Sequence, residues 1–501
     1  MLYGAGFSLR NLLVKRRLKI LFVTSELTPL VSTGGLADVA AALPRALHAQ
    51  GCDVRVVMPR YRSIAGHYRG EPAGMCMADL GVKMEYGALR RTTAPGTKIP
   101  LYFIEHEGYF GRERPYGVGA YEYDDNAERF CFFSQAVLHG LAQNGWRPDV
   151  VHCNDWHTAP IPVFMRTRYR ADAFWGRVPA LFTIHNIAFQ GRYSADKFAS
   201  TGFEPWLFSP QYVECEGDMN LMKGAIAFAT RLNTVSPRYA REIQTPEYGA
   251  GLDGMLRTRS GDLRGILNGV DYEHWNPATD PHIAANYDVD DLKGKAVCKR
   301  ALQKTFGLPQ RNAPVFGLVS RLYWQKGVDI LADAMDRLAA MELQFVFLGA
   351  GDPELENRLA DIARRHPDKV AARFSFDAPL AHQVQAGSDF FVMPSRYEPC
   401  GLSQLYSLAY GTVPVVRKTG GLADSVRDVN PVHWKRGDAT GITFVPLTPE
   451  AILRAVRRAM ELYADKKRLA KVRRAGMRED FSWDRSCREY IRLYEEAIAA
   501  A

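Results

Sequence analysis

The segment Ser395–Asp424 reads SRYEPCGLSQLYSLAYGTVPVVRKTGGLAD, and it indicates an α/β fold. The residues just before it, 389–394, form a short apolar run typical of a buried parallel strand. After a turn that contains Glu398, apolar residues recur at helical spacing from Leu402 to Ala409. A strand, a tight turn carrying a carboxylate and a helix therefore follow one another.

The turn before this helix is a candidate phosphate site, because a helix start offers free N–H groups and partial positive charge. Glu398 would lie beside it, where its carboxylate can bond neutral hydroxyls or face developing positive charge. A second predicted strand, 412–417, ends in another glycine turn, Lys418-Thr-Gly-Gly421. The alternative is that both turns are ordinary strand–helix loops, since glycines are common there.

The composition is that of a globular protein with more than one core. The chain has 501 residues, of which 47% are hydrophobic and 24% charged, and its length predicts two large domains. A net charge of +9 fits a nucleic acid, an anionic small substrate or a solvated surface. The basic run 466–478 alternates with apolar residues at helical spacing, so we expect a solvated helix face and no nucleic-acid partner.

No stretch approaches the length of a membrane span, and no membrane association is expected. The eight cysteines include no CxxC pair, so their spacing suggests neither a zinc ribbon nor a disulfide framework and favours reduced thiols in a cytoplasmic enzyme. Residues 1–18 carry too short an apolar run for a signal peptide and are interpreted as an extension. The DxD string at 288–290 lies in a polar segment and predicts a solvated turn.

Patterns elsewhere in the chain predict further strands and helices. Residues 19–25 form a strand, and a helix over 36–47, which Pro44 interrupts, follows a glycine loop. Other strands are expected at 52–59, 101–105, 149–155, 180–186, 231–236, 263–271, 315–321, 344–351 and 370–376, and other helices at 124–141, 219–229, 293–307, 328–340 and 484–499. A second series of alternating strands and helices begins at residue 315, which places a domain boundary between about 267 and 312.

One internal repeat links the two ends of the chain. Ser32–Asp38 reads STGGLAD and Lys418–Asp424 reads KTGGLAD. Strand, glycine loop and helix open a nucleotide-binding α/β unit, although neither loop is a GxGxxG or P-loop motif. We interpret them as two similar turns, on two α/β domains that face one cleft. In each turn glycine would let the backbone approach an oxygen-rich ligand.

Polar residues follow several predicted strands. The strand at 149–155 ends in Asp155, the strand at 180–186 in His185 and Asn186, and the strand at 263–271 contains Asn268. Such residues point into the ligand crevice of a parallel sheet. The alternative for a single histidine is a structural hydrogen bond, but two strand ends of this kind favour function.

Arg321 and Lys326 lie in one loop between a strand and a helix. An arginine fork and a lysine point charge could together hold a diphosphate without a metal, although both could also be surface cations. Phe376 could stack on a nucleotide base, with Asp377 bonding it, or could be a core residue.

Together these motifs resemble the bacterial glycogen synthase and plant starch synthase family, glycosyltransferase family 5. The matching strings span Ile20 to Tyr494 and are STGGLADV, DNAERF, DVVHCNDWH, TIHNIAFQG, LNGVD, SRLYWQKGVD, the segment quoted first and the terminal FSW. The resemblance implies a GT-B α/β fold: two Rossmann-like domains facing across a deep cleft, with a last helix crossing back. The expected parts of the chain are an N-terminal extension at 1–18, an N-terminal domain at 19–267, a C-terminal domain at 268–480 and the crossing helix at 481–501.

The resemblance further implies transfer of glucose from ADP-glucose to the non-reducing end of an α-1,4-glucan, glycogen or a maltooligosaccharide, with retention at the anomeric carbon and with no cofactor or metal. The alternatives are a related GT-B enzyme that uses UDP-glucose or another acceptor, and a catalytically weak carbohydrate-binding relative.

It also implies roles for individual residues. Arg321 and Lys326 neutralise the departing diphosphate, Glu398 contacts the donor sugar, and Asp155 lies near the reaction centre. His185, which contacts glucose, is the remaining expected catalytic residue. The expected donor-binding positions are Gly34, Gly35, Asn186, Asn268, Thr419, Phe376 in place of a stacking tyrosine, and the backbone N–H groups of Cys400, Gly401 and Leu402.

One position departs from the family. Ser32 stands where the first loop usually has a lysine that touches the donor phosphates. Losing one charge-assisted contact costs about 1.5–3 kcal/mol, which would weaken donor binding. We hypothesise that Lys418, in the second glycine turn, partly compensates.

Overall fold

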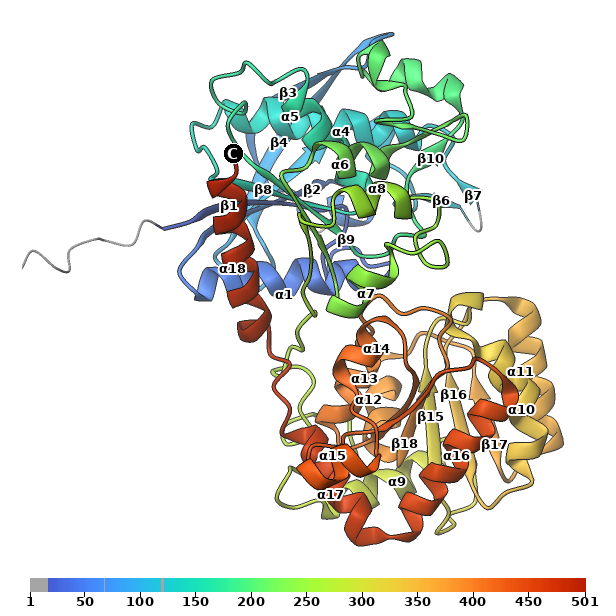
Figure 1. The fold of residues 1–501 in the computed structure, drawn as a ribbon. Helices are drawn as coiled ribbons and strands as arrows, with labels where there is room; N and C mark the ends of the chain where they lie inside the picture. The colour runs from blue at the N-terminus through green and yellow to red at the C-terminus, as the bar shows by residue number, and fades with distance from the viewer. Residues whose placement is uncertain (1–16, 67, 119–120) are drawn as a thin grey trace, which may run out of the picture. The chain divides into compact units, whose positions relative to one another are not determined.

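The computed structural model describes residues 17–66, 68–118 and 121–501. The extension predicted at 1–18 lies almost entirely outside them. The chain forms two compact units. Unit 1 comprises residues 1–182, 191–230 and 493–501, and unit 2 comprises 183–190 and 231–492; Figure 1 shows the ribbon coloured along the chain.

The first large sheet has nine strands in the order β14-β13-β9-β8-β1-β2-β5-β4-β3. β1 pairs in parallel with β2 on one side and with β8 on the other, whereas β4 is antiparallel to β3 and β5. The strands are β1 (Lys19–Val23), β2 (Asp53–Pro59), β3 (Glu71–Asp79), β4 (Met84–Thr93), β5 (Pro100–Glu105), β8 (Val150–Asn154), β9 (Ala180–Ile184), β13 (Arg231–Thr234) and β14 (Leu263–Gly265).

The second large sheet has six parallel strands in the order β17-β16-β15-β18-β19-β20. This is the 3-2-1-4-5-6 order of a Rossmann fold, in which the direction of winding reverses beside the first strand. The strands are β15 (Val315–Val319), β16 (Gln344–Leu348), β17 (Val370–Arg373), β18 (Phe390–Met393), β19 (Val413–Arg417) and β20 (Ile442–Phe444). Two small sheets contain β6 (Gly117–Val118) with β7 (Tyr121–Glu122), and β10 (Arg192–Tyr193), β11 (Glu214–Cys215) and β12 (Asp218–Asn220).

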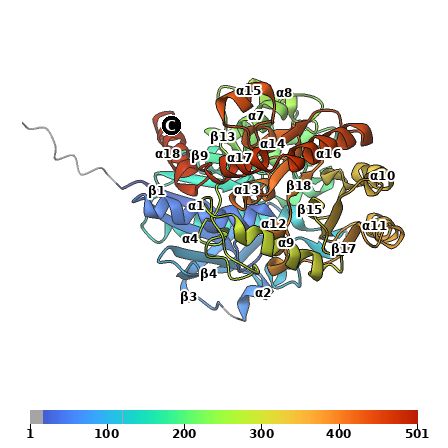
Figure 2. The same ribbon diagram turned by 90° about the horizontal axis from the view of Figure 1, so that it is seen from below.

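Helices cover both faces of the six-stranded sheet. Alternate residues of its strands enter two cores, because successive side chains of a strand point to opposite faces. Phe316 and Phe345 pack with α10 (Val328–Ala339), α11 (Pro353–Arg365) and α16 (Pro449–Ala464), while their strand neighbours pack with α9 (Lys293–Thr305) and α12 (Ala378–Gly387). Figures 1 and 2 show α10 and α11 on one side of this sheet and α9 and α12 on the other.

The remaining helices lie between strands along the chain, except α17 and α18, which follow the last strand. They are α1 (Gly35–Ala49), α2 (Arg62–Ala65), α3 (Glu107–Phe110), α4 (Asn126–Ala142), α5 (Pro160–Arg166), α6 (Leu221–Phe228), α7 (Pro237–Glu242), α8 (Asp253–Thr258), α13 (Ser403–Ala409), α14 (Gly420–Ser425), α15 (Pro431–Arg436), α17 (Lys466–Met477) and α18 (Trp483–Ala499).

Two sequence predictions about these elements were wrong. Pro44 does not interrupt the first helix: α1 runs through it, with Pro44 itself buried. One missing N–H costs a single hydrogen bond, and the buried apolar face of α1 offsets that loss. The strand predicted at 263–271 ends at Gly265, because Val270 instead donates its N–H to the carbonyl of Phe481 at 2.7 Å.

The last helix begins in unit 2 and ends in unit 1. Within unit 2, Asn233 Nδ2 donates to the Tyr490 hydroxyl at 3.0 Å. Within unit 1, the Tyr494 hydroxyl lies 2.8 Å from Nδ1 of His152, a fully buried residue of β8. The predicted crossing helix is therefore present, and one turn of α18 carries the residues that attach it to each unit.

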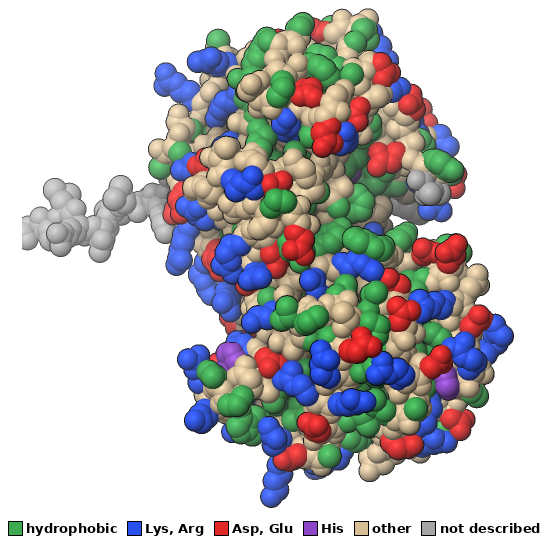
Figure 3. Space-filling view, turned by 45° about the vertical axis from the view of Figure 1, so that its right-hand side comes forward, with side chains coloured by type: hydrophobic (Ala, Val, Ile, Leu, Met, Phe, Trp, Pro, Cys, Tyr) green, Lys and Arg blue, Asp and Glu red, His purple; other side chains and the backbone are tan. Residues whose placement is uncertain are grey.

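The charged surface is mixed in sign. Figure 3 shows Lys and Arg side chains interspersed with Asp and Glu over the visible face. The basic run 466–478 forms α17, whose apolar Leu469 and Val472 are buried, as predicted for a solvated helix face. Asp288 accepts the N–H groups of Asp290 and Asp291 at 2.9 and 2.8 Å, so the DxD string is an exposed turn.

Among the described residues, no helix meets the length and apolarity needed to cross a membrane.

Candidate functional site

The predicted site residues follow the strands at which each sheet reverses its winding. In the first sheet the reversal falls between β1 and β8, which precede the Ser32–Gly35 loop and Asp155. In the second sheet it falls between β15 and β18, which precede the Arg321–Lys326 loop and Glu398. Ligands of open α/β sheets bind at the carboxyl ends of strands at such reversals. The two positions are therefore the candidate functional sites of the fold.

Glu398 is buried and paired in unit 2. Its carboxylate accepts hydrogen bonds from Lys326 Nζ at 2.7 and 3.0 Å, and from the Ser395 hydroxyl at 2.9 Å. The side chains of Glu398 and Lys326 are 6% and 19% exposed, so solvent screens this ion pair weakly. The loops after β15 and β18 are thus joined at their charged residues, and Lys326 and Glu398 each fix the other's position.

Arg321 carries an uncompensated charge in the same region. Within the described part of the chain its guanidinium makes no ion pair or hydrogen bond, and it lies over the Tyr323 ring at 5.6 Å. The nearby Tyr397 hydroxyl is hydrogen-bonded to Asn186. Burial raises the pKa of Tyr397, and the charge of Glu398 raises it further while that of Arg321 opposes the rise. Arg321, Glu398 and Asn186 therefore share one neighbourhood.

The turn before α13 presents free N–H groups. The backbone N–H groups of Cys400, Gly401 and Leu402 donate to no other group among the residues that the structure describes. Gln404 Nε2 donates to the carbonyls of Cys400 and Gly401 at 3.1 and 2.9 Å. Because C=O and N–H point oppositely in a trans peptide, these bonds turn the N–H groups of Gly401 and Leu402 away from Gln404. This arrangement can bind an anion.

Asn268 has an unsatisfied oxygen. The residue is 6% exposed, and its Oδ1 has no hydrogen-bond partner in the described part of the chain. A buried acceptor of this kind costs free energy unless a ligand satisfies it, and a sugar hydroxyl is a suitable donor. The Cys400 thiol is bonded to the backbone of Asn268, and burial raises the pKa of this thiol to about 12. Asn268 and the anion-binding turn are thus adjacent.

Phe376 is not a core residue. It follows β17 and is 77% exposed, which leaves its ring available to stack on a base. Asp377 caps α12 by accepting the Leu380 N–H at 2.9 Å.

Thr419, in the second glycine turn, is buried. It donates its hydroxyl to Glu242 Oε2 at 3.1 Å and its N–H to the Arg417 carbonyl at 3.0 Å.

The two glycine turns use their glycines differently. A Cβ on Gly420 (φ +44°) would lie 1.8 Å from the carbonyl oxygen of Glu398, and a Cβ on Gly421 would lie 2.0 Å from that of Cys400. A Cβ on Gly34 would have nothing within 4 Å. The second turn therefore needs glycine for protein packing, whereas the position of the missing Cβ of Gly34 is open space. That a ligand approaches the backbone of both turns stays a prediction.

Alanine at the two turns should separate packing from ligand approach. Gly420→Ala should destabilise unit 2 by about 2–4 kcal/mol, because a backbone carbonyl must shift. Gly34→Ala is the matched control, since its extended backbone (φ −174°) suits any residue, and its unfolding temperature should not change. Differential scanning calorimetry measures both. Equal melting temperatures for the two variants would contradict the packing role of Gly420.

Buried glutamates hold both turns. Glu242 Oε2 accepts the Thr419 hydroxyl at 3.1 Å and the Gly420 N–H at 2.9 Å. Glu26 accepts the Thr33 N–H and hydroxyl, each at 2.6 Å. The repeated threonine thus has the same kind of anchor in each turn. Sequence reasoning missed both carboxylates. Glu26 directly follows a predicted strand, but Glu242 lies 177 residues from Thr419, so no local pattern could connect them.

In unit 1, the loop after β1 borders a cavity of about 470 Å³. Its lining includes Ser32 and Thr33 from that loop, and Arg114, Tyr116 and Glu122 from the segment before α4. The DNAERF motif fixes this second segment: Asn126 Nδ2 donates to the Tyr116 carbonyl at 2.9 Å, and buried Arg129 Nη2 donates to that of Pro115 at 3.1 Å.

Asp155 has an unusual backbone conformation. It directly follows β8 with φ 56° and ψ 178°, a region that non-glycine residues rarely occupy, and it is 8% exposed. Such a conformation costs about 1–3 kcal/mol, and residues that keep one cluster at functional sites. This strain is independent support for the prediction that Asp155 lies near the reaction centre.

His185 is neutral at physiological pH, since burial lowers its pKa to about 3. The unfolded histidine, with a pKa near 6.5, binds a proton that the folded one does not, so stability should fall as the pH drops below 6.5. Between pH 7.5 and 5.5 this group should account for a loss of about 1.4 kcal/mol. Urea unfolding at both pH values should show a smaller loss for His185→Gln than for wild type; equal losses would contradict this.

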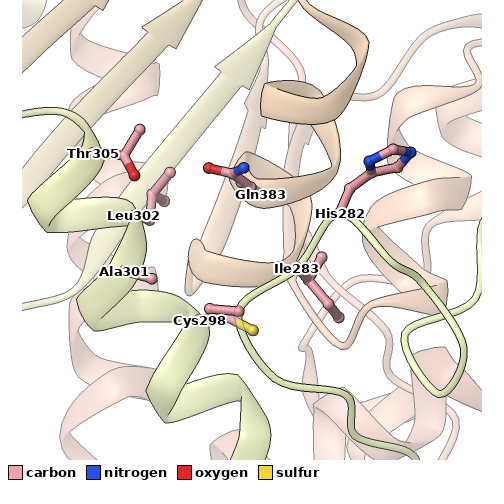
Figure 4. A pocket seen from close by; sticks show the side chains of 8 residues that line it. His282, Ile283, Cys298, Ala301, Leu302, Thr305 and Gln383 are labelled. Atoms are coloured by element: carbon pink, nitrogen blue, oxygen red, sulfur yellow. The ribbon is translucent and has the colours of Figure 1, made fainter.

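A further cavity lies away from the strand ends. Figure 4 shows it between α9 and α12, lined by His282, Cys298 and Gln383 among others, with a volume of about 250 Å³. None of the predicted site residues lines it. Over the described ranges, no cluster of three or more His, Cys, Asp or Glu side chains has an arrangement that could hold a metal ion.

Comparison with known proteins matches both halves of the chain. Residues 19–258 match a family model described as starch synthase catalytic domain, and residues 301–476 match one described as glycosyl transferases group 1. A glycogen synthase from Anaeromyxobacter sp. is 46% identical over 485 residues, covering 96% of this chain and 100% of the relative. The chain belongs to the glycogen synthase family of glycosyltransferases.

Other relatives agree with this family. Glycogen synthase 1 of Methylococcus capsulatus is 44% identical over 489 residues, covering 96% of this chain and 97% of the relative. The catalytic domain of starch synthase IV from Arabidopsis thaliana, solved with ADP and acarbose bound, is 33% identical with a TM-score of 0.87, covering 96% of this chain and 100% of that one. The resemblance and the GT-B fold inferred from the sequence are confirmed. This member of the glycogen synthase family is a glucosyltransferase of glycogen and starch synthesis.

Proposed function

We propose that the protein transfers glucose from ADP-glucose to the non-reducing end of an α-1,4-glucan, glycogen or a maltooligosaccharide, with retention of anomeric configuration. The observation that supports this most directly is the charge pattern after β15 and β18: a free guanidinium, an anion-binding turn and a buried Glu–Lys pair. Family members named glycogen synthase, and an Arabidopsis relative with ADP bound, support the nucleotide and the glucan.

The leaving diphosphate is held by positive groups in this proposal. Arg321 would bond two phosphate oxygens with its fork, and the N–H groups at Cys400, Gly401 and Leu402 would bind the distal phosphate. Lys326 would stabilise the negative charge that develops as the glucosyl–phosphate bond breaks. These groups make a divalent ion unnecessary, so we expect transfer without a metal or other cofactor.

The glucosyl group develops positive charge as it leaves. Glu398, fixed by Lys326 and Ser395, provides a carboxylate for this charge or for the sugar hydroxyls, and Asn268 Oδ1 accepts a hydroxyl. His185 and Asn186 contact glucose, with Asp155 near the reaction centre. We favour departure and attack on the same face of the sugar, which retains configuration without a covalent enzyme intermediate.

The alternative is a related enzyme that uses UDP-glucose or a different acceptor. The exposed ring of Phe376 would stack on either base, so it does not decide between the nucleotides. A donor panel with glycogen primer, measuring ADP or UDP release with and without EDTA, tests both points. We expect transfer from ADP-glucose that EDTA leaves unchanged. Preference for UDP-glucose, or loss of activity with EDTA, would contradict the proposal.

We propose that the reaction takes place in the cytoplasm. All eight cysteines are free thiols, and seven of them are buried, which suits a reducing compartment.

A further inference from the structure

A methionine-rich face of unit 1 is exposed. β3 and β4 form an antiparallel hairpin at one edge of the nine-stranded sheet. One face of this hairpin packs against α4, since a Cβ on Gly87 would lie 3.0 Å from the ring of Phe132, and one on Gly140 would lie 3.3 Å from Cys76 Cβ. Because successive side chains of a strand point to opposite faces, the neighbours of Cys76 and Gly87 lie on the other side.

Large apolar side chains occupy this other side. Met77 and Tyr86 lie directly opposite each other in the register of β3 and β4, and Met75 and Met84 are each two residues from one of them, so all four share one face. Together with Val82 in the connecting turn, we call them the hairpin face. The exposed fractions are 60% for Met75, 37% for Met77, 65% for Val82, 45% for Met84 and 62% for Tyr86. A contiguous apolar patch of this kind marks an interaction site.

The hairpin face is large enough for a small protein–protein interface. At these exposed fractions its five residues offer on the order of 500 Å² of mostly apolar surface. Two copies packed face to face would bury roughly 1,000 Å² in total, which is the lower limit for a specific interface. Methionine side chains are flexible, so two such faces can fit together without preformed complementary shapes.

The charges around the hairpin face are paired within the protein. Lys83 contacts Glu85 at 3.0 Å, and Arg90 forms an ion pair with Glu105. The rim therefore presents no block of one charge sign, such as an anionic membrane or a nucleic acid would need. A second copy meets little like-charge repulsion there, although the whole chain carries a net charge of +9.

The free edge of β3 is a poor docking element. Pro72 has no backbone N–H, and the register of β3 with β4 shifts between Pro72 and Gly74. Proline and irregular register on an edge strand both hinder the addition of another strand. Association at this hairpin would therefore use its face.

We propose that the hairpin face is the contact surface of a homodimer, in which two copies of this chain pack through the same face about a two-fold axis. Such a contact uses one patch twice and closes on itself. A glucan is a poor occupant, because the Tyr86 hydroxyl is the one strong hydrogen-bonding group among the five side chains. The interface is at the small end of the usual range, so the dimer is reversible, with a micromolar Kd. The inference does not depend on the proposed function.

Sedimentation velocity over a roughly hundredfold range of micromolar concentrations tests the proposal. The wild type should change from monomer to dimer as its concentration rises. Met77→Glu and Tyr86→Glu should each weaken dimerisation at least about tenfold, because each buries a carboxylate in an apolar contact. Val432→Glu, at a 55% exposed apolar residue of unit 2, is the matched control and should leave dimerisation unchanged. Equal melting temperatures would show that the variants are folded.

A mixture of two variants tests whether the partner is a second copy. Tyr86→Glu and Tyr86→Lys each place like charges against a copy of themselves, so each alone should be monomeric. The mixture brings opposite charges together and should dimerise more strongly than either variant alone.

Four outcomes would overturn the proposal. They are a wild type that stays monomeric over the whole range, dimers that both glutamate variants form as readily as the wild type, and a mixture that associates no better than its components. The fourth is binding of the wild type to glycogen or to anionic vesicles that both glutamate variants lose, which would assign the face to a glucan or a lipid surface in place of a second copy.

Discussion

Glu398→Gln should lower kcat about 10²–10³-fold with little change in the KM for ADP-glucose, because in the proposed mechanism its carboxylate acts on charge that develops as the donor bond breaks. Glutamine keeps the shape and the hydrogen-bonding capacity of the side chain, so the Ser395 hydroxyl retains a partner. What it removes is the negative charge that faces Lys326 at 2.7 Å. Glu398→Ala should be at least as severe.

Initial rates of ADP release at saturating glycogen provide the measurement. Ser395→Ala is the matched control, since it removes a neutral hydrogen bond to the same carboxylate at 2.9 Å and should lower kcat less than about tenfold. The unfolding temperature of each variant must be compared, because Glu398→Gln leaves Lys326 without its ion partner. A Glu398→Gln enzyme that is folded and retains near-normal kcat would refute the role.

Arg321→Ala should lower kcat/KM for ADP-glucose about 10²–10⁴-fold. The guanidinium has no ion partner among the described residues, so its charge is available for the diphosphate, and a bidentate contact combines two charge-assisted hydrogen bonds of about 1.5–3 kcal/mol each. Arg321→Lys should recover only part of the loss, because an ammonium group cannot reproduce the planar fork.

Two further measurements make this prediction specific. Arg364→Ala removes an arginine of α11 whose side chain is 77% exposed, and it should leave kcat/KM unchanged. ADP affinity by calorimetry should fall with Arg321→Ala, while stability should not, because the guanidinium makes no ion pair or hydrogen bond with the residues that the structure describes. Unchanged ADP affinity would show that Arg321 does not contact the phosphates.

The sequence predicted much of the fold because each strand and helix has a local pattern. β18 and α13 lie where the apolar runs before and after Glu398 placed them, and the polar ends of β8 and β9 were recognised from one short segment each. The prediction at Pro44 was wrong, because the energy of burying one face of α1 is not visible in a local rule about proline. The strand at 263–271 was predicted too long, since Val270 pairs with residues near Phe481 instead of extending β14.

The sequence alone determined the α/β class, the family and the identity of Arg321, Lys326 and Glu398 as candidates, since spacing and residue type are local information. Only the tertiary structure decided how these residues are held. It paired Lys326 with Glu398, bound the second glycine turn to the carbonyl of Glu398, and gave each threonine a buried glutamate. It also brought Arg114 and Ser32 to the lining of one cavity. Apart from the contact of Glu26 with Thr33, seven residues apart, these contacts join residues far apart along the chain, and such contacts exist only after the chain has packed.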